Sequence, residues 1–443
     1  MLAGRRLAVA SSTALSSKFS TNSAASDKYK ILVVGAGSGG LSVANQIFDR
    51  FASAGKSLNS GDIAILDANE WHYYQPGWTL VGSGLLSKST TRRPLSSLIS
   101  KHLTHIPENV KSFAPESSSV TTTSGRSISY DTLVVAAGLQ INWNGIKGLP
   151  QALVDSTSGV SSIYSYDTCD KVWSDIEGLR NGNAIFTQPA GVVKCAGAPQ
   201  KIMWMALDRF KKTSRANNIK VDFYTGMPTM FSVKKYSDVL DDLRQKRNVG
   251  GHFQHNLVSI DSANHKATFK KADNTTTDVD YTTLHVTPPM GPLDFLKGSP
   301  IVDDSGYVSI DPATLQHTKP SFGNIFALGD CSSAPTSKTA AAVTGQAPVL
   351  TENLFSLMDT GKISSAKYDG YTSCPLLTGY GELLLAEFKY GLKPKESFAW
   401  MDQSRPNRFF YHLKKDVFPT AYWNFMVKGK WFGTNTIFRP SYT

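Results

Sequence analysis

Cysteine is scarce in this chain, and no apolar run is long enough to cross a bilayer. Four cysteines occur in 443 residues, too few for the dense cross-links that hold small secreted domains together. No stretch of about 18 apolar residues is present, so the sequence predicts no membrane-spanning helix. These absences exclude a disulfide-rich secreted scaffold and a helical membrane-spanning protein. They leave a globular chain of two or three domains.

Acidic residues are missing from the first 26 positions. Arg5, Arg6 and Lys18 occur there among many Ser and Thr residues, and the first acid is Asp27. This composition is typical of a mitochondrial transit peptide over residues 1–26, although a merely disordered N-terminus would share it.

The chain is basic even without that segment. The formal net charge is +11, and three of these charges lie in residues 1–26, so +8 remains. A basic balance is compatible with a nucleic acid or an anionic membrane surface as partner. Since no recognised nucleic-acid-binding fold or Arg-rich patch accompanies the charge, we expect no nucleic-acid partner.

The order of apolar runs and turns predicts an α/β protein with two nested Rossmann-like dinucleotide-binding domains and a C-terminal membrane-associating region. The first domain is expected at 27–150 and again at 291–360, and the second domain at 151–290. The return is indicated by FGNIFALGDCSS, a buried strand that ends in Gly-Asp and precedes a helix-like run. Residues 361–443, rich in aromatics, Lys and Arg, form the C-terminal region.

Gly35, Gly37 and Gly40 form a GxGxxG pattern directly after an apolar strand and at the start of a helix. The first glycine permits a tight turn, the second lets a pyrophosphate approach the backbone, and the helix N-terminus supplies amide donors. Asp67 closes the next predicted strand, where an acid can accept hydrogen bonds from an adenosine ribose; a solvated acid at a strand end would look the same. The pattern predicts a dinucleotide site.

Two distant segments indicate which dinucleotide is bound. TLVVAAG, followed through Ala137-Gly138, and NIFALGD, ending in Gly329-Asp330, resemble the paired segments of FAD-dependent oxidoreductases with two dinucleotide folds. In those proteins the acid at the position of Asp330 binds the ribityl chain, and NAD-only dehydrogenases lack the late return. The helix opening at SKTAAAV would direct its positive end at the flavin pyrimidine, or Ser337 simply caps a core helix. We expect FAD and no metal site.

The second domain lacks a glycine fingerprint of its own. Its first turn reads QPAGVVKCAGAPQK and its second strand ends in FYTG, where a nicotinamide site would carry glycines and then an acid or a basic phosphate ligand. The sequence therefore favours an electron donor other than nicotinamide, although a degenerate loop would still permit one.

A cysteine occupies the turn instead. Cys195 lies before a helix predicted to begin near Pro199, between Lys194 and Lys201. Both the helix terminus and the lysines favour a thiolate. Two-electron disulfide chemistry needs a second thiol, and Cys374 in YTSCP is a candidate, although sequence spacing does not show that the two meet.

The other two cysteines are interpreted as buried packing residues, the default for an isolated cysteine. They are Cys169, within SYDTCDKVW, and Cys331, which directly follows Asp330.

Four segments resemble the mitochondrial sulfide:quinone oxidoreductases, flavoproteins of the wider disulfide-reductase lineage. They are KCAGAPQK, YTSCP, YYQPGWTLVG and NIFALGDCSSAPTSKTAAAV, and the likeness extends from about residue 28 to the C-terminus. The resemblance implies that Cys195 and Cys374 are the redox pair, bridged by a disulfide or an extra sulfur. The residues expected at FAD are Gly35, Gly37, Ser38, Gly39, Gly40, Asp67, Gln75, Val110, Ala137, Gly138, Gly329, Asp330, Lys338, Thr339, Ala340 and Ala341.

The resemblance also implies a reaction. Hydrosulfide attacks the bridge at Cys374, which leaves a persulfide there and a sulfur anion on Cys195. Cys195 donates two electrons to FAD, and the persulfide sulfur passes to glutathione, sulfite or a second sulfide. Reduced FAD then reduces ubiquinone.

The C-terminal region is expected to contact the membrane that holds the quinone. FFYHLKKDVFPTAYWNFMVKGKWFGTNTIFRP combines Phe, Tyr and Trp with Lys and Arg, a composition that suits segments lying in a lipid interface. An aromatic packing or homodimer surface would have the same composition. Together with the basic charge, the segment predicts a monotopic protein of the mitochondrial inner membrane.

Two other functions remain compatible with the sequence. A type II NADH:quinone dehydrogenase would share the fold, FAD and membrane attachment, but it needs a competent nicotinamide loop and no cysteine pair. A flavin-containing assembly or signalling protein would show no turnover.

Overall fold

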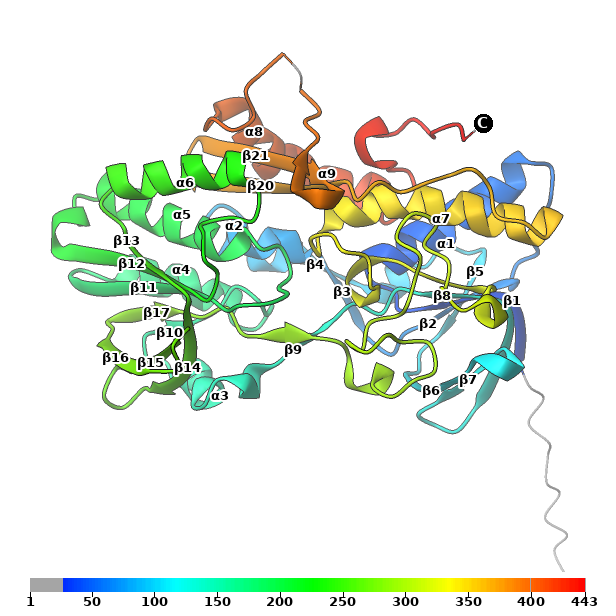
Figure 1. Ribbon diagram of the computed structural model, residues 1–443, viewed down its shortest axis with the longest axis horizontal. Helices are drawn as coiled ribbons and strands as arrows, with labels where there is room; N and C mark the ends of the chain where they lie inside the picture. The colour runs from blue at the N-terminus through cyan, green and yellow to red at the C-terminus, as the bar shows by residue number, and fades with distance from the viewer. Residues whose placement is uncertain (1–26, 399, 443) are drawn as a thin grey trace, which may run out of the picture.

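The computed structural model describes residues 27–398 and 400–442, so the predicted transit peptide lies outside the described residues. Two largely parallel sheets lie side by side, and a C-terminal layer covers one side of both (Figure 1). The predicted α/β class with two nested dinucleotide-type units is confirmed.

The first sheet is mostly parallel and buried on both faces. Its order is β5-β2-β1-β8-β7-β6, and β19 pairs with β8 as well. Ile31 to Val34 in β1 are each at most 3% exposed, as expected for a parallel sheet covered on both sides. The strands are β1 (Asp27–Val34), β2 (Ile63–Leu66), β5 (Leu103–Ile106), β6 (Val110–Ala114), β7 (Ser119–Thr122), β8 (Ser127–Val135) and β19 (Ile325–Ala327).

The segment THIPENVKSF does not form one continuous strand. It contains the end of β5 and the start of β6, separated by the residues around Pro107. Proline has no amide donor and so cannot continue a sheet ladder. The chain turns there, and β6 pairs antiparallel with β7.

Two long helices cover the first sheet. They are α1 (Ser38–Ser53) and α7 (Ala340–Thr360), which pack against each other although they are far apart in sequence. Arg50 on α1 forms a two-pronged ion pair with Glu352 on α7, at 2.6 and 2.9 Å. The late segment of the chain is thus built into the first domain.

The second sheet has the order β10-β17-β11-β12-β13 and is entirely parallel. Helices α4, α5 and α6 pack around it, while a three-stranded meander lies on its other side (Figure 1). The elements are α3 (Leu149–Val154), β10 (Val160–Ser161), α4 (Cys169–Gly178), β11 (Gly182–Gln188), α5 (Ala198–Lys212), β12 (Ile219–Thr225), α6 (Lys234–Lys246), β13 (Gly250–Phe253), β14 (His255–Asp261), β15 (Lys266–Lys271), β16 (Thr276–Asp280) and β17 (Thr283–His285).

The chain passes between the domains twice, at two short strands that pair with each other. These are β9 (Gln140–Ile141), on the way into the second domain, and β18 (Met290–Gly291), on the way back. Short elements β3 (Trp71–Tyr73), α2 (Trp78–Val81) and β4 (Arg92–Pro94) connect the first sheet with this region.

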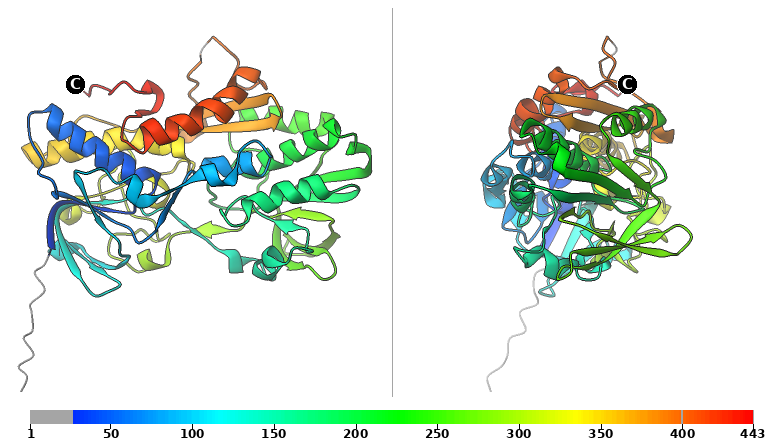
Figure 2. Two further views of the ribbon diagram at one scale, coloured as in Figure 1. Left: turned by 180° about the vertical axis from the view of Figure 1, so that it is seen from behind. Right: turned by 90° about the vertical axis from the view of Figure 1, so that its left-hand side faces the viewer.

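The C-terminal layer consists of a small antiparallel sheet, whose first two strands form a hairpin, and one irregular helical segment. The strands are β20 (Thr372–Gly379), β21 (Glu382–Lys389) and β22 (Lys393–Pro394). The helical segment comprises α8 (Arg408–His412), a π-helical turn Leu413–Val417, α9 (Phe418–Ala421) and a second π-helical turn Tyr422–Met426. It runs across the top of both domains (Figure 2). Among the described residues, no helix is both long and apolar enough to cross a membrane.

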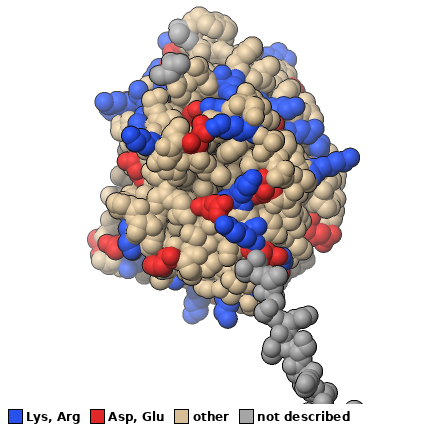
Figure 3. Space-filling view, turned by 90° about the vertical axis from the view of Figure 1, so that its right-hand side faces the viewer, with Lys and Arg blue, Asp and Glu red and all other residues tan. Residues whose placement is uncertain are grey.

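The first domain forms one end of the molecule, and positive and negative side chains alternate over the surface of that end. Lys and Arg side chains are interspersed with Asp and Glu side chains over this face (Figure 3). The net positive charge is therefore not gathered there into one patch.

Candidate active site

The predicted cofactor residues collect at one edge of the first sheet. Gly35 follows β1, Asp67 follows β2, Ala137-Gly138 follows β8 and Gly329-Asp330 follows β19. These strands are parallel neighbours, so their carboxyl ends lie together, where open α/β sheets bind ligands. Val110 differs from the others, because it opens β6 and is buried in the core of this domain.

The three glycines of the first turn have the spatial roles that a dinucleotide requires. Gly35 has φ +98° and lies against the backbone of Ala136, while a Cβ on Gly40 would stand 1.8 Å from the Gly35 carbonyl oxygen. Gly37, by contrast, has no neighbouring atom within 4 Å of the position of a Cβ. Its open side, at the N-terminus of α1, leaves room for a pyrophosphate beside the backbone. The residues present therefore fit FAD.

Asp67 also braces this turn. Its Oδ2 accepts a hydrogen bond from the Ala36 amide at 2.6 Å, and Oδ1 accepts from the Asn69 amide at 2.8 Å. The carboxylate thus fixes the glycine turn to the end of β2.

The N-terminus of α7 forms the other wall of this edge. Thr339, and not Ser337, caps the helix by accepting a hydrogen bond from the Ala342 amide at 3.0 Å. Within the helix, Gln346 accepts from the Gly329 amide at 2.8 Å. A hydrogen bond therefore joins the first turns of α7 to the Gly329-Asp330 turn.

Cys195 and Cys374 meet where the two domains and the C-terminal layer join. Their Sγ atoms are 3.4 Å apart. Cys195 lies in the turn before α5, and Cys374 lies in β20. The structure therefore brings together the two cysteines that were predicted as a pair.

Local backbone geometry makes this approach possible. Cys195 has φ +51°, a left-handed conformation that costs a non-glycine residue on the order of 1–2 kcal/mol and that clusters at functional sites. A Cβ on Gly197 would stand 2.6 Å from the Cys374 sulfur and 2.2 Å from Leu376. Only glycine at 197 lets β20 come this close to the turn.

A buried lysine adjoins the sulfur pair. Lys201 is 2% exposed, and its Nζ donates to the Cys195 sulfur at 3.1 Å. Although burial opposes protonation, the sulfurs of Cys195 and Cys374 raise the pKa of Lys201, so its ammonium group stays charged. The sequence predicted that this lysine favours a thiolate at Cys195, and its contact with that sulfur agrees with the prediction.

The two thiols are electrostatically different. The hydrogen bond from Cys374, followed by the charge of Lys201, holds the pKa of Cys195 well below its ordinary value despite burial. The same shared proton and burial raise the pKa of Cys374. Cys195 is therefore the thiolate of the pair and Cys374 the thiol.

A second buried lysine reaches the pair from the C-terminal segment. Lys414, in the first π-helical turn, is 3% exposed and donates to the Pro76 carbonyl at 2.8 Å. Burial and then the charge of Lys201 lower the pKa of Lys414 to about 7. Sequence reasoning missed this residue, and the available signal was only a Lys-Lys pair within an aromatic segment.

The turn that contains Cys195 is hydrogen-bonded to residues that were predicted to hold FAD. The Cys195 amide donates to the Lys338 carbonyl at 2.9 Å, just before α7. Lys194 donates through Nζ to Gln75 Oε1 at 3.2 Å. These contacts place the sulfur pair beside the residues that were predicted to hold FAD, although the sequence separates them by more than a hundred positions.

The other cysteines are inert by environment. Burial raises the pKa of Cys169 to about 12 and that of Cys331 to about 11. Both side chains are fully buried, and neither sulfur has another thiol as its hydrogen-bond partner. Their surroundings agree with the interpretation as packing residues.

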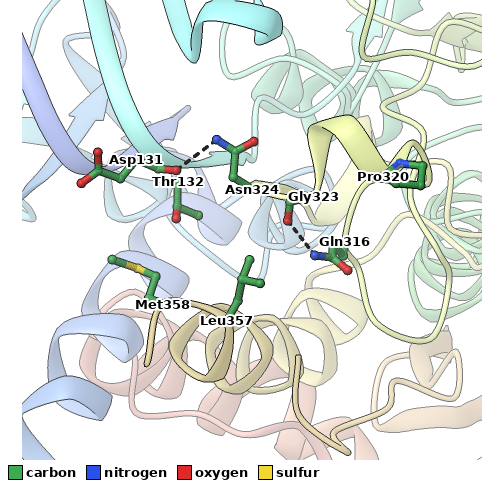
Figure 4. A pocket seen from close by; sticks show the side chains of 8 residues that line it. All are labelled: Asp131, Thr132, Gln316, Pro320, Gly323, Asn324, Leu357 and Met358. Carbon is green, nitrogen blue, oxygen red and sulfur yellow. Dashed lines mark hydrogen bonds between the residues drawn. The ribbon is translucent and has the colours of Figure 1, made fainter. Parts of the chain in front are cut away.

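A shallow hollow of about 580 Å³ lies elsewhere on the first domain (Figure 4). Asp131 and Thr132 lie in the middle of β8, and Asn324 directly precedes β19. Asn324 donates to the Asp131 carbonyl at 3.0 Å. The hollow is thus at the end of the strands opposite to the glycine turn, away from the edge where dinucleotides bind.

Comparison with known proteins places this arrangement among flavin-type oxidoreductases. The family profile of the pyridine nucleotide-disulphide oxidoreductases matches residues 29–176. The mitochondrial sulfide:quinone oxidoreductase of Schizosaccharomyces pombe is 50% identical over 438 residues, covering 94% of each chain. That of Dictyostelium discoideum is 47% identical over 413 residues, covering 93% of this chain and 88% of its own.

Solved structures show the same fold at lower identity. A chain from the mitochondrial ATP synthase tetramer of Tetrahymena thermophila superposes with a TM-score of 0.78 at 21% identity, over 93% of this chain and 98% of that chain. The sulfide:quinone oxidoreductase of Aquifex aeolicus superposes with a TM-score of 0.71 at 17% identity, over 90% and 92% of the two chains.

Proposed function

The chain belongs to the sulfide:quinone oxidoreductase family, and we propose that Cys195 and Cys374 are the redox pair through which it oxidises sulfide. It is an FAD-dependent enzyme with a quinone as electron acceptor. The observation that carries the proposal is the 3.4 Å contact between the two sulfurs. The sulfurs of a disulfide are about 2.05 Å apart, so a small movement would bring these two to bonding distance. The present gap between them also leaves access for a sulfur atom that bridges the pair.

The polarity of the pair assigns different roles to the two sulfurs. Hydrosulfide attacks the Cys374 sulfur of the bridged pair, the bond to the Cys195 side breaks, and its electron pair stays on Cys195 as a thiolate. Lys201, 3.1 Å from that sulfur, stabilises the leaving thiolate, which accelerates exchange. Cys374 is left as a persulfide.

The cycle closes when the persulfide is transferred. A nucleophilic acceptor attacks the outer sulfur, the sulfur–sulfur bond to Cys374 breaks, and its electron pair stays on Cys374 as a thiolate. Re-forming the bridge between the two thiolates releases two electrons. FAD, held by the residues at the edge of the first sheet, would supply the acceptor for these electrons, with ubiquinone as the final acceptor.

We propose an anionic sulfur acceptor. Lys201 and Lys414 are both buried at the pair, and a buried positive charge attracts and orients an anion. Glutathione thiolate, sulfite and hydrosulfide all meet this requirement. The acceptor thus approaches from the side of the two lysines.

We also propose that the C-terminal layer docks on the mitochondrial inner membrane, where the quinone is dissolved. Large apolar side chains are exposed there, among them Trp400 (74%), Phe409 (44%) and Phe438 (73%). Lys415 and Lys428 lie on the same segment. Apolar side chains that enter the lipid boundary beside cations are typical of interfacial binding. A homodimer formed through this surface would be a different outcome, and it would show as a change of mass in solution.

The NADH dehydrogenase alternative is disfavoured by the second domain. Gly226 stands at the end of β12, where a nicotinamide site usually has an acid or a basic residue. The amide of Ala190, in the loop after β11, already donates to Asn256 at 2.7 Å. The loop that would hold a second pyrophosphate is therefore occupied by internal contacts.

The proposal is tested by sulfide-dependent quinone reduction with matched cysteine variants. Cys195→Ser and Cys374→Ser should each abolish turnover, while Cys169→Ser, at a buried cysteine outside the pair, should keep it. Retention of turnover in either of the first two variants would contradict the assignment.

A further inference from the structure

The C-terminal segment touches the glycine turn through one fully buried hydroxyl. Tyr422, in the second π-helical turn, is 3% exposed. Its hydroxyl oxygen lies 2.7 Å from Ser38 Oγ and 2.6 Å from His72 Nε2. A residue near the end of the chain is therefore joined to the first residue of α1.

The hydrogen bonds in this group have a defined direction. His72 Nδ1 lies 2.9 Å from the Ala36 carbonyl, which only accepts, so Nδ1 carries the ring proton. Burial lowers the pKa of His72 to about 4, which leaves the ring neutral and Nε2 an acceptor at neutral pH. Tyr422 therefore donates to His72, and Ser38 donates to Tyr422.

The same face of α1 makes further contacts with the C-terminal segment. Ser42 donates to the Met426 carbonyl at 2.8 Å, and Asn45 donates to the Val427 carbonyl at 3.1 Å. With Ser38, these residues recur at the spacing of one helix face. A Cβ on Gly429 would stand 2.8 Å from the Asn45 Cβ, so the two segments are in close contact.

We propose that Tyr422 and His72 are positioning residues for FAD, which fix the glycine turn in the shape that receives the pyrophosphate. The inference rests on the FAD site of the proposed function. His72 and Tyr422 hold Ala36 and Ser38, the residues on either side of Gly37, whose open side faces the site. Because Ser38 donates inward to Tyr422, the backbone amides remain as the donors to the phosphates.

FAD binding and docking of the C-terminal segment must affect each other equally, because they are thermodynamically linked. If the C-terminal segment favours FAD binding, bound FAD must favour docking of that segment by the same factor. Lys414 lies on the same helical segment as Tyr422, so FAD binding would also hold this lysine at the sulfur pair.

The test compares two Tyr→Phe variants by their FAD dissociation constants. Tyr422→Phe removes one hydroxyl and leaves His72 and Ser38 without their partner, so FAD should bind about three- to tenfold more weakly. Tyr390→Phe is the matched control, because that hydroxyl donates to the Pro312 carbonyl at 2.8 Å, away from the glycine turn. It should bind FAD like the unaltered protein.

Hydrogen exchange supplies the second readout. Adding FAD to the apoprotein should slow amide exchange over residues 408–431, and Tyr422→Phe should reduce this protection by the same factor as it weakens FAD binding. If Tyr422→Phe folds poorly, Ser42→Ala breaks another contact of the same interface and should weaken FAD about twofold.

Unchanged FAD affinity in both Tyr422→Phe and Ser42→Ala would overturn the proposal. So would rates of amide hydrogen exchange over residues 408–431 that are the same with and without FAD. Neither measurement involves sulfide. A failure of the proposed function would instead appear as a flavin that binds with full affinity but that sulfide does not reduce.

Discussion

The Sγ atom of Cys195 lies 3.4 Å from the Sγ atom of Cys374, although the two residues are 179 positions apart. One belongs to a strained turn of the second domain, and the other to the first strand of the C-terminal hairpin. The pair therefore forms only when the second domain and the C-terminal layer are both in place.

Replacing Lys201 by Met should raise the pKa of Cys195 and slow sulfide-dependent flavin reduction. The lysine makes a buried charge-assisted contact at 3.1 Å, of a kind worth about 1.5–3 kcal/mol. That energy corresponds to a pKa rise of about one to two. The pH dependence of Cys195 alkylation in the reduced protein measures it. Lys211→Met, on the exposed face of the same helix, should alkylate like the unaltered protein, and an unchanged profile in Lys201→Met would contradict the role.

Lys414 should make the free energy of unfolding depend on pH in the neutral to alkaline range. Its pKa is lowered from 10.5 to about 7 in the folded protein, so the unfolded chain binds more protons between these values. The free energy of unfolding therefore rises with pH across this window, by on the order of 5 kcal/mol from this group, and the contribution is lost as pH falls towards 7. Urea unfolding at a series of pH values measures it.

The matched control for Lys414 is its neighbour Lys415, which is half-buried and pairs with Asp416 at 2.6 Å. Lys414→Met should flatten the rise between pH 7 and 10.5 given by these pKa values, whereas Lys415→Met should preserve it. Equal slopes in the two variants would show that Lys414 is not the group responsible.

Gly197→Ala should separate the sulfurs without removing either. The added methyl would stand 2.6 Å from the Cys374 sulfur, closer than packed atoms approach. We expect at least a roughly tenfold loss of sulfide-dependent turnover with FAD retained, since displacement of about 1 Å at reacting atoms costs on that scale. Gly178→Ala, where a Cβ meets nothing within 4 Å, serves as the control. Full activity of Gly197→Ala would contradict the close fit of this turn.

Removing exposed aromatics of the C-terminal layer should weaken membrane binding. Trp400→Ser combined with Phe409→Ser takes away two large exposed side chains, and each buries apolar area worth about 1.5–3 kcal/mol when it enters lipid. Co-sedimentation with liposomes containing anionic lipid should fall at least tenfold. Val154→Ser, which changes a side chain 86% exposed on the second domain, should leave sedimentation unchanged. The same result in all variants would place the membrane contact elsewhere.

The gathering of the expected FAD residues at one edge of the first sheet could be predicted because its signals are local. The glycine turn follows its strand directly in sequence, and Asp67, Ala137 and Asp330 each end a recognisable apolar strand. Parallel strands bring such ends to one edge without further information. The absence of a glycine fingerprint in the second domain could also be read locally from the sequence. In the structure, Gly226 and Ala190 of the corresponding loops lie against Asn256.

Contacts with the C-terminal segment were not predictable in this way. Lys414 and Tyr422 point inward from two π-helical turns, and a regular helical periodicity does not indicate which residues such turns direct to the core. Their partners, Pro76 and Ser38, are more than three hundred positions away. The pairing of Cys195 with Cys374 followed from family resemblance, not from spacing.

The most direct test of the redox pair is an anaerobic titration of the FAD-loaded protein with sulfide, followed by flavin absorbance. With sulfide as the only reagent, one sulfide attacks the bridge and a second accepts the persulfide sulfur, so two sulfides should bleach one flavin in the unaltered protein. Neither Cys195→Ser nor Cys374→Ser should be bleached on the same timescale. Equal bleaching in either variant, or bleaching by NADH as readily as by sulfide, would contradict it.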